Sequence, residues 1–480
     1  MPLPRIDQTC YNNVRILDHP CLPNARRLDE GCLPMIWQYH HHGIAIDKQH
    51  FSDLAAKLRA KLEVLVDEMD LMLGRPATPL NYNSGDQVAR LLFHELGLRA
   101  RTSDGTPKMT KGGAREKCDD EVLMGLKDQH PIVNHILLAR QADKLIGTYV
   151  EKLPQMVGAD GRLRTTFRHT VARTGRLASE DPNLQNIPTR TADGVEIRKG
   201  FVATRDSLNR QCVLASLDLS QIEMVLAGHL SQDPVLLGAF REGTDIHTIT
   251  AANCFRLERD YLMYLWRKSA VEEEGGDPQW LPGEKVEWKT FKSTKRLPAK
   301  TVGFGILYGQ TATGAQGNIV AQGGPFLQIE EVEEIIRGWF ALYSGITLWM
   351  EVQYWRAMTY GFVWDMWGRI RRIPESQSKL KRIRNEGFRQ AGNMPITASA
   401  QGLIKLDMAQ LMPIVEHFQR YKDVRCWPLL QIHDELTFEL SPNIADDFCG
   451  IAQEVMQTNV VLTAPVKASW GIAERWGDLK

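Results

Sequence analysis

Two acidic residues, Asp434 and Glu435, interrupt an apolar run near the end of the chain. The stretch 431–439 reads QIHDELTFE, and apolar residues typical of buried strands lie on both sides of the acids. A second such run, VLASLDLS, ends at Asp218 and its neighbours. Like charges beside a core destabilise each other unless cations neutralise them. If the two strands are neighbours, Asp218 and Asp434 suit Mg²⁺ or Mn²⁺, and two such ions would clamp the attacking and leaving oxygens of a phosphoryl transfer.

One predicted helix carries two cations and two aromatic rings at four-residue spacing. These residues are Arg296, Lys300, Phe304 and Tyr308. The cations suit phosphates, and the rings suit a base or a sugar. An ordinary amphipathic helix is the alternative, but Gly303, Gly305 and Gly309 each cost about 1 kcal/mol relative to Ala in a helix. The glycines favour the close approach of a ligand or a helix that moves.

Another acid, Glu223, lies in a helix-start pattern directly after Asp218. Ser220 and Glu223 form S-x-x-E before an apolar run. We therefore expect Ser220 to begin a helix and Glu223 to cap it.

The bulk composition is that of an ordinary globular protein. Its 480 residues suffice for two to four domains or one multi-lobed unit, and 58 basic residues balance 58 acidic ones. This balance gives no global basic field of the kind that often accompanies nucleic-acid binding. The sequence contains no long apolar run, no signal-peptide pattern and no C-x-x-C pair among its eight cysteines. We expect reduced thiols, no membrane partner and a cytoplasmic location, in a bacterium or a virus-infected host cell.

Two local patterns fit more than one interpretation. The segment 369–384 is strongly basic, which fits either a solvated face or contacts to phosphates. The first 45 residues contain three cysteines and the motif YHHHG, which fit either an irregular segment or, at looser spacing than usual, a zinc site.

The periodicity places these residues on a mixed set of elements. Helices are expected around Leu54–Val66, from Ser84 to about Gly97, and up to Pro154, with a flexible basic loop over 99–117. After this elongated helical third come strands, then helices over about 245–342, strands again over 361–373, a long helix over 389–421 and a hairpin over 426–440.

Four motifs in this order resemble the family A DNA polymerases, the DNA polymerase I group. They are ARTGRLASEDPNLQNIP (172–188), DLSQIE (218–223), RLPAKTVGFGILYG (296–309) and QIHDE (431–435). The similarity extends over about 35–480, because segments of the first third resemble the thumb of that family. The resemblance implies an α+β fold shaped as a right hand, with an antiparallel palm sheet, a helical thumb and helical fingers.

The resemblance also implies a division of the chain. The expected parts are an N-terminal segment (1–45), the thumb (46–155), a first palm part (156–245), the fingers (246–388) and a second palm part (389–480). The fingers carry an insertion at about 260–292 of unknown role. The segment before the thumb is too short for a proofreading 3′ to 5′ exonuclease or a 5′ nuclease, so neither activity is expected of this chain.

Roles for individual residues follow from the resemblance alone. Two Mg²⁺ ions, replaceable by Mn²⁺, would be held by Asp218, Asp434 and the Leu219 carbonyl, with Glu435 in support. Lys300 would also donate a proton to the leaving pyrophosphate. The expected dNTP-binding residues are Arg296, Lys300, Phe304, Tyr308, Glu223, Gln221 and His247. The expected primer-template contacts are Arg176, Asn183, Gln185, Asn186, Arg389, Asn393, Gln431 and His433. Glu223 would exclude a 2′-hydroxyl, and Thr397 stands where many relatives have Gln.

The predicted function is template-directed DNA synthesis from dNTPs. A single-subunit RNA polymerase, an added reverse transcriptase activity and an inactive DNA-binding scaffold are the alternatives. Glu223 and the tandem HDE favour DNA over RNA synthesis, and the intact acids argue against a scaffold. Primer-template DNA and dNTPs are the expected partners, and a processivity factor, a helicase or a separate exonuclease are further candidates.

Overall fold

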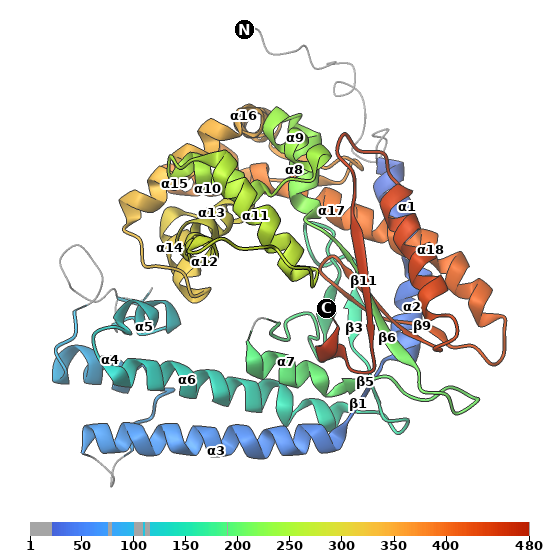
Figure 1. Cartoon of the computed structure of the whole chain (residues 1–480), viewed down its shortest axis with the longest axis horizontal. Helices are drawn as coiled ribbons and strands as arrows, with labels where there is room; N and C mark the ends of the chain where they lie inside the picture. Colours follow the sequence, from blue (N-terminus) through green and yellow to red (C-terminus); the bar gives the residue numbers. More distant parts are fainter. Residues whose placement is uncertain (1–21, 75–78, 100–108, 111–115, 190, 480) are drawn as a thin grey trace.

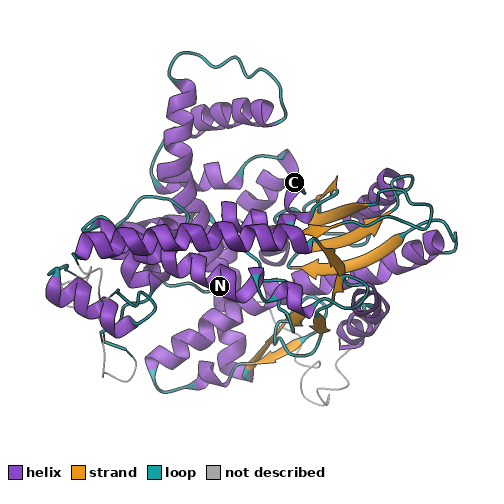
Figure 2. Cartoon of the chain, turned by 90° about the horizontal axis from the view of Figure 1, so that it is seen from below, coloured by secondary structure: helices purple, strands orange, loops and turns teal. Residues whose placement is uncertain are grey.

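A four-stranded antiparallel sheet lies at one side of the molecule, and helices make up most of the rest (Figure 1 and Figure 2). This computed structural model describes residues 22–74, 79–99, 109–110, 116–189 and 191–479. Most of the predicted basic loop over 99–117 lies outside the described residues, as do Cys10 and Cys21. Among the described residues, no helix is both long enough and apolar enough to cross a membrane.

The sheet joins strands from distant parts of the sequence in the order β11-β6-β10-β9. Its strands are β6 (Val213–Leu219), β9 (Cys426–Ile432), β10 (Glu435–Leu440) and β11 (Ala468–Ala473). The predicted strand after 213 and the predicted hairpin over 426–440 are both confirmed. Helix α18 (Ala445–Thr458) packs on β6 and β11, and α17 (Lys381–Gln419) packs on α18 and β9. The long helix therefore begins eight residues before the predicted start at 389, within the basic segment.

The first third of the chain forms an elongated helical arm, seen at the bottom of Figure 1. Its elements are α3 (Lys48–Leu73), α4 (Gly85–Ala89) with the π turn Arg90–Glu95, α5 (Asp120–Leu126), and α6 (Pro131–Leu145) with the π turn Ile146–Val150. Ser84 caps α4 as predicted, because its side chain accepts from the Gln87 N–H. A separate apolar core that includes Met69, Leu92 and Ile136 holds the outer end of the arm together.

Small sheets and short helices join the arm to the main sheet. The elements are α1 (Leu22–Gly31), α2 (Leu33–His42), β1 (Ile44–Ile46), β2 (Arg162–Leu163), β5 (Phe201–Val202), α7 (Ala192–Lys199), the 3-10 turns Leu153–Met156 and Trp476–Asp478, and the hairpin β3 (Thr166–Arg168) and β4 (Ala178–Glu180). The two N-terminal helices pack on α17, and α2 also packs on β9.

The middle of the chain forms a second helical region above the arm in Figure 1. It contains α8 (Ile222–Ser231), α9 (Pro234–Glu242), α10 (Ile246–Cys254), α11 (Arg259–Glu273), α12 (Glu284–Phe291), the π turn Lys292–Arg296, α13 (Leu297–Leu307), α14 (Ala312–Ala321), α15 (Ile329–Leu342), α16 (Ser344–Tyr360), the hairpin β7 (Phe362–Trp364) and β8 (Ile370–Arg372), and the 3-10 turn Pro374–Gln377. The predicted run of helices and the strands over 361–373 are confirmed.

Candidate active site

The strand register brings three carboxylates to one end of the main sheet. Glu435, the first residue of β10, is directly opposite Asp218 of β6. Asp434 lies in the two-residue turn before β10, and its carbonyl oxygen accepts a hydrogen bond from the Leu219 N–H at 3.2 Å. The turn requires a left-handed backbone at His433, whose φ is 55°. Asp218 and Asp434 are thus brought together by strand pairing, as the sequence predicted.

The pKa values of this pair are raised. Burial, followed by the negative charge of Glu435, raises the pKa of Asp218 to about 6, although part of this side chain remains open to solvent. Burial, followed by the charges of Glu223 and Asp218, raises the pKa of half-buried Asp434 to about 7. Arg176 and the Gln401 amide, 3.5 Å from the carboxylate, oppose this rise. Both shifts show that the ionised pair is costly in the metal-free protein.

The donor set suits a cation that completes its coordination with other ligands. Within the described ranges, neither Asp218 nor Asp434 forms an ion pair, and no group of three His, Cys, Asp or Glu side chains is arranged to hold a metal. Mg²⁺ is usually bound by one or two carboxylates, with water and substrate phosphates filling the other positions. Two hard oxygen donors with raised pKa values fit this pattern, whereas the zinc interpretation of the N-terminal region gains no support from the described residues.

Glu223 is buried, accepts two hydrogen bonds from side chains and does not cap a helix. It is 4% exposed, accepts from Arg176 Nη2 at 3.0 Å and from the Tyr308 hydroxyl, and burial raises its pKa. The predicted capping box is wrong. Helix α8 begins after Gln221, which has a left-handed backbone and no capping side chain. Ser220 instead continues the pairing between β6 and β11, because its N–H donates to the Lys467 carbonyl at 2.8 Å.

Helix α13 and the π turn before it present the predicted cationic and aromatic residues. Arg296 donates two hydrogen bonds to Asp245, at 2.7 and 2.8 Å. Burial would raise the pKa of Asp245, but Arg296 and Thr248 hold it below its usual value. Lys300 lies one turn further along, and its charge helps to lower the pKa of nearby His247.

The aromatic half of this face lies nearer the carboxylates. His247 is 6% exposed, and its ring centre lies 5.4 Å from that of Phe304. Burial lowers the pKa of His247 to about 3, so the ring is neutral. Tyr308, just past the end of α13, is 49% exposed and reaches Glu223. This face therefore has a cationic end, Arg296 and Lys300, that suits phosphates, and an aromatic end that lies beside the acids.

Packing within the protein accounts for two of the glycines on α13. A Cβ at Gly305 would lie 2.3 Å from the Gln310 side chain, and one at Gly303 would lie 3.0 Å from Trp339. These contacts provide a reason for glycine that is independent of any ligand.

The predicted DNA contacts separate into two groups. Beside the carboxylates, Gln185 Nε2 donates to the Gln431 side chain at 3.0 Å, and Gln431 in turn donates to the His433 carbonyl. The Asn183 side chain accepts a hydrogen bond from the Gln185 N–H at 3.1 Å. For Asn186 it is the backbone carbonyl that accepts, from the Tyr149 hydroxyl at 2.8 Å. This group adjoins Arg176 and thereby Glu223.

The second group joins α17 to the end of α13. Asn393 Nδ2 donates to the Leu307 carbonyl at 2.6 Å and to Thr397 Oγ1 at 3.0 Å. Arg389 packs against Gly309, where a Cβ would lie 2.8 Å from the Arg389 Cβ. Gly309 also has a φ of 70°, in the left-handed region that favours glycine. Sequence reasoning did not find Asp245 or Gln401, because their partners lie 51 and 33 positions away and no local pattern marks such contacts.

The family model for "DNA polymerase family A" matches residues 48–270 and 283–478. The chain belongs to the family A DNA polymerases. It is 35% identical over 439 residues to the thermostable DNA polymerase I of Thermus thermophilus, which covers 91% of this chain and 46% of the relative. It is 31% identical to DNA polymerase I of Bacillus subtilis, over 91% of this chain and 44% of the relative. This polymerase chain thus spans a little under half the length of the curated relatives that it matches.

A solved structure supports the fold assignment. The POL domain of Pol1 from M. smegmatis, in complex with DNA primer-template and dNTP, has a TM-score of 0.75 and 29% sequence identity. The alignment covers 96% of this chain and 71% of the other. The predicted α+β right-hand polymerase fold is therefore confirmed. The family match leaves out 271–282, which lies inside the predicted insertion, while the boundaries of palm, fingers and thumb stay predictions.

Proposed function

We propose that this chain extends a DNA primer along a DNA template by adding dNTPs to the primer 3′-hydroxyl. The observation that carries the proposal is the adjoining position of Asp218 and Asp434, with pKa values raised to about 6 and about 7. A family A polymerase that retains this pair keeps the residues that nucleotidyl transfer needs.

Asp218, Asp434 and the Leu219 carbonyl would hold two divalent ions, with Mn²⁺ able to replace Mg²⁺. When bound, these ions stabilise negative charge on the attacking and leaving oxygens of the transfer. In the reaction, the primer 3′-oxygen bonds to the α-phosphorus while the bond from that phosphorus to the bridging oxygen breaks. The primer hydroxyl loses its proton to water, and Lys300 gives a proton to the departing pyrophosphate. Glu435, directly opposite Asp218 in the sheet, would support the site without binding metal tightly.

The dNTP would lie along α13. Arg296 is oriented by its paired hydrogen bonds to Asp245, so its position toward a triphosphate is fixed before the ligand binds. Phe304 would pack on the sugar, with neutral His247 beside it. Glu223 would lie below the sugar and exclude a 2′-hydroxyl, with Gln221 at the same helix start. Tyr308 donates to Glu223 in the present structure and would move to the template base when the site fills.

Primer and template would be held by the two groups of polar residues described above. Gln185, Gln431 and His433 lie beside the acids, where contacts to minor-groove acceptors report base-pair shape without reading sequence. A processivity factor, a helicase and a separate exonuclease remain candidate partners. In the proposed cytoplasmic location, the free thiols of the described cysteines, for instance Cys32 and Cys426, would stay reduced.

Primer extension on a DNA template with Mg²⁺ tests the proposal. The wild type is expected to extend a labelled primer with dNTPs and not with rNTPs, and Asp434→Ala is expected to abolish extension. Asp277→Ala, at an exposed acid outside the site, is the matched control and should extend normally. Duplex binding without extension by the wild type would indicate a scaffold, and efficient rNTP use would indicate an RNA polymerase. A lane without dNTPs tests the predicted lack of proofreading, because shortening of the primer would contradict it.

A further inference from the structure

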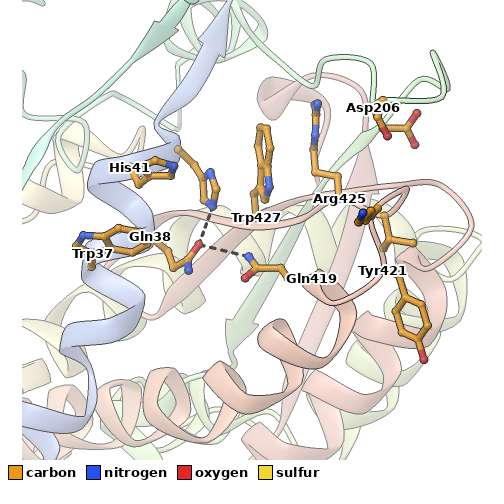
Figure 3. Close-up of a pocket in the computed structure, with 12 residues that line it drawn as sticks. Trp37, Gln38, His41, Asp206, Gln419, Tyr421, Arg425 and Trp427 are labelled. Carbon is orange, nitrogen blue, oxygen red and sulfur yellow. Dashed lines mark hydrogen bonds between the residues drawn. The ribbon is translucent and has the colours of Figure 1, made fainter.

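A cavity of about 380 Å³ lies beside the start of β9 (Figure 3). Helix α2, the end of α17, the turn after it and the start of β9 form its walls. Trp427 of β9 lines the cavity, while Ile432 at the other end of the strand pairs with Glu435 beside Asp218. Five residues of a strand span roughly 17 Å. The cavity is therefore separate from the polymerase site.

Aromatic side chains form a continuous row along this cavity, which Figure 3 shows from Trp37 to Arg425. The Trp37 and His41 rings stack with centres 5.0 Å apart and planes 6° from parallel. His41 meets His42 edge-on at 5.0 Å, and His42 stacks on Trp427 at 4.4 Å. The Arg425 guanidinium lies over the other side of Trp427, 4.1 Å from its centre. Such a row is a stack of rings that ends at Arg425, whose charge is paired with Glu439 at 2.7 Å.

Two glutamines fix the orientation of the row. Gln38 Oε1 lies 2.6 Å from His42 Nε2 and accepts from Gln419 Nε2 at 3.3 Å. Gln419 also donates to the Cys426 carbonyl at 2.8 Å. Helix α2, the end of α17 and β9 are thus tied together by side-chain amides, and the cavity is held open before any ligand enters.

The mouth of the cavity exposes rings and a free cation. Trp37 is 60% exposed and Tyr421 is 57% exposed, although both are large apolar side chains. Lys422 is exposed and forms no ion pair within the described residues. The acid in the cavity wall, Asp206, is buried and pairs with Arg210 at 2.7 Å. An open aromatic face beside an unpaired ammonium suits a base and a phosphate.

The family match begins at residue 48, whereas Trp37, Gln38, His41 and His42 belong to α2, which ends at His42. The wall that carries the exposed indole therefore lies before the part of the chain that the family model matches.

We propose that this cavity binds a nucleotide unit, with the base stacked on Trp37 and the phosphate beside Lys422. The nucleotide comes either from a free nucleoside phosphate or from an unpaired stretch of DNA strand. A cavity of this size encloses one such unit, whereas a stable protein partner buries about 800 Å² on each side. The site is distinct from the dNTP site along α13 and holds its ligand without chemical change.

Competition binding with the polymerase site occupied tests the proposal. The full chain is saturated with an unlabelled hairpin primer-template, and binding of a short fluorescein-labelled oligothymidylate is followed by anisotropy. Trp37→Ala and Lys422→Glu are each expected to weaken this binding by about tenfold or more, since stacking on one aromatic ring is worth about 1–3 kcal/mol. Trp37→Phe retains a ring and should retain most of the affinity. Leu33→Ala, an exposed position on the same helix, is the matched control and should bind as the wild type does.

Two further measurements complete the test. Unlabelled thymidine monophosphate and unlabelled oligothymidylate are compared as competitors. Equal displacement by both would identify free nucleotides as the ligand, whereas displacement by the oligonucleotide alone would identify an unpaired strand. Primer extension and thermal unfolding should be the same in all four variants and the wild type. Equal oligonucleotide binding by the wild type and Trp37→Ala would overturn the proposal. So would dimerisation that Trp37→Ala abolishes without any effect on oligonucleotide binding, because the face would then be a contact between copies.

Discussion

The two ends of strand β10 lie beside acids that the protein treats in opposite ways. Glu439 is 0% exposed and receives hydrogen bonds from Arg162 at 2.5 Å, Arg425 at 2.7 Å, and the Thr204 N–H and hydroxyl at 2.8 and 2.7 Å. Burial would raise its pKa, but these cations and donors hold the pKa below its usual value. The buried charge at this end is fully compensated by the protein.

At the other end, Glu435 lies opposite Asp218 and next to Asp434. The Ser216 hydroxyl donates to Glu435 at 2.6 Å, while the pKa values of both aspartates are raised. The two ends of the strand thus adjoin a compensated acid, Glu439, and an under-compensated pair, Asp218 and Asp434. The first pattern is typical of a structural role, whereas raised pKa values in a pair of adjoining carboxylates are typical of functional sites.

The largest expected effect is a loss of polymerase activity, without a loss of stability, on substitution at the Asp218 end of β10. Asp218→Asn should lower primer extension by at least about a thousandfold, because one of the two carboxylates that would hold the metal ions loses its charge. The free energy of unfolding without metal should be unchanged or higher, since the repulsion with Glu435 is removed. Quench-flow extension and urea unfolding measure the two properties. Loss of stability together with activity would contradict the distinction.

A substitution at the other end of β10, Glu439→Gln, should affect stability and not activity. Glu439→Gln leaves Arg162 and Arg425 without a charged partner in the interior and should destabilise the protein by about 3–5 kcal/mol. Glu334→Gln, at an exposed glutamate on α15, should change stability by less than about 0.5 kcal/mol. Extension per folded molecule should be retained in both. A neutral Glu439→Gln would show that this end is not compensated as described.

The two ends should also respond to pH with opposite signs. Between about pH 4 and pH 6–7, the folded metal-free protein holds protons on Asp218 and Asp434 that an unfolded chain has lost, so stability falls as pH rises. The slope for Asp434 is at most about 1.4 kcal/mol per pH unit. Glu439 contributes stability above its unfolded pKa, and this is lost as pH falls through the folded value.

Urea unfolding in EDTA across this pH range measures the two contributions. Asp434→Asn should reduce the fall in the free energy of unfolding as pH rises toward neutral. Glu439→Gln should reduce the loss of that free energy as pH falls in the acid range. A wild-type stability that rises steadily from pH 4 to pH 7 after the Glu439 contribution is subtracted would contradict the raised pKa values.

The smallest expected effect concerns the coupling between Glu223 and the pair. The charge of Glu223 helps to raise the pKa of Asp434, so Glu223→Gln should lower it. The pH at which extension reaches half of its plateau should therefore move downward, with Mg²⁺ and dNTP held constant. Glu334→Gln should leave the profile in place, and an upward movement with Glu223→Gln would contradict the coupling.

Periodic and local signals in the sequence predicted most of the framework. The amphipathic stripe through Leu54 and Leu58, the cap at Ser84 and the apolar runs ending at Asp218 and Asp434 all depend on neighbours a few positions away. The resemblance then supplied the topology that places the two runs side by side.

Contacts between distant residues were not predictable in the same way. Glu223 satisfied the pattern of a capping box, yet Arg176 and Tyr308 bind it from 47 and 85 positions away. The compensation of Glu439 depends on Arg162, 277 positions away. A local motif competes with such partners only in the folded chain, which is why the sequence misassigned Glu223 and gave no sign of the Glu439 network.

The strand order also governs how the protein is made. Strand β6 lies between β11 and β10, and both neighbours come later in the chain, with Ser216 and Glu435 219 positions apart. At about 5–20 residues per second, the ribosome delivers β10 roughly 10–45 s after β6. During that interval β6 has two unpaired edges, and its apolar residues form a template for aggregation. Nascent chains of this polymerase therefore need the helices between β6 and β10 to fold early, or a chaperone to cover the waiting strand.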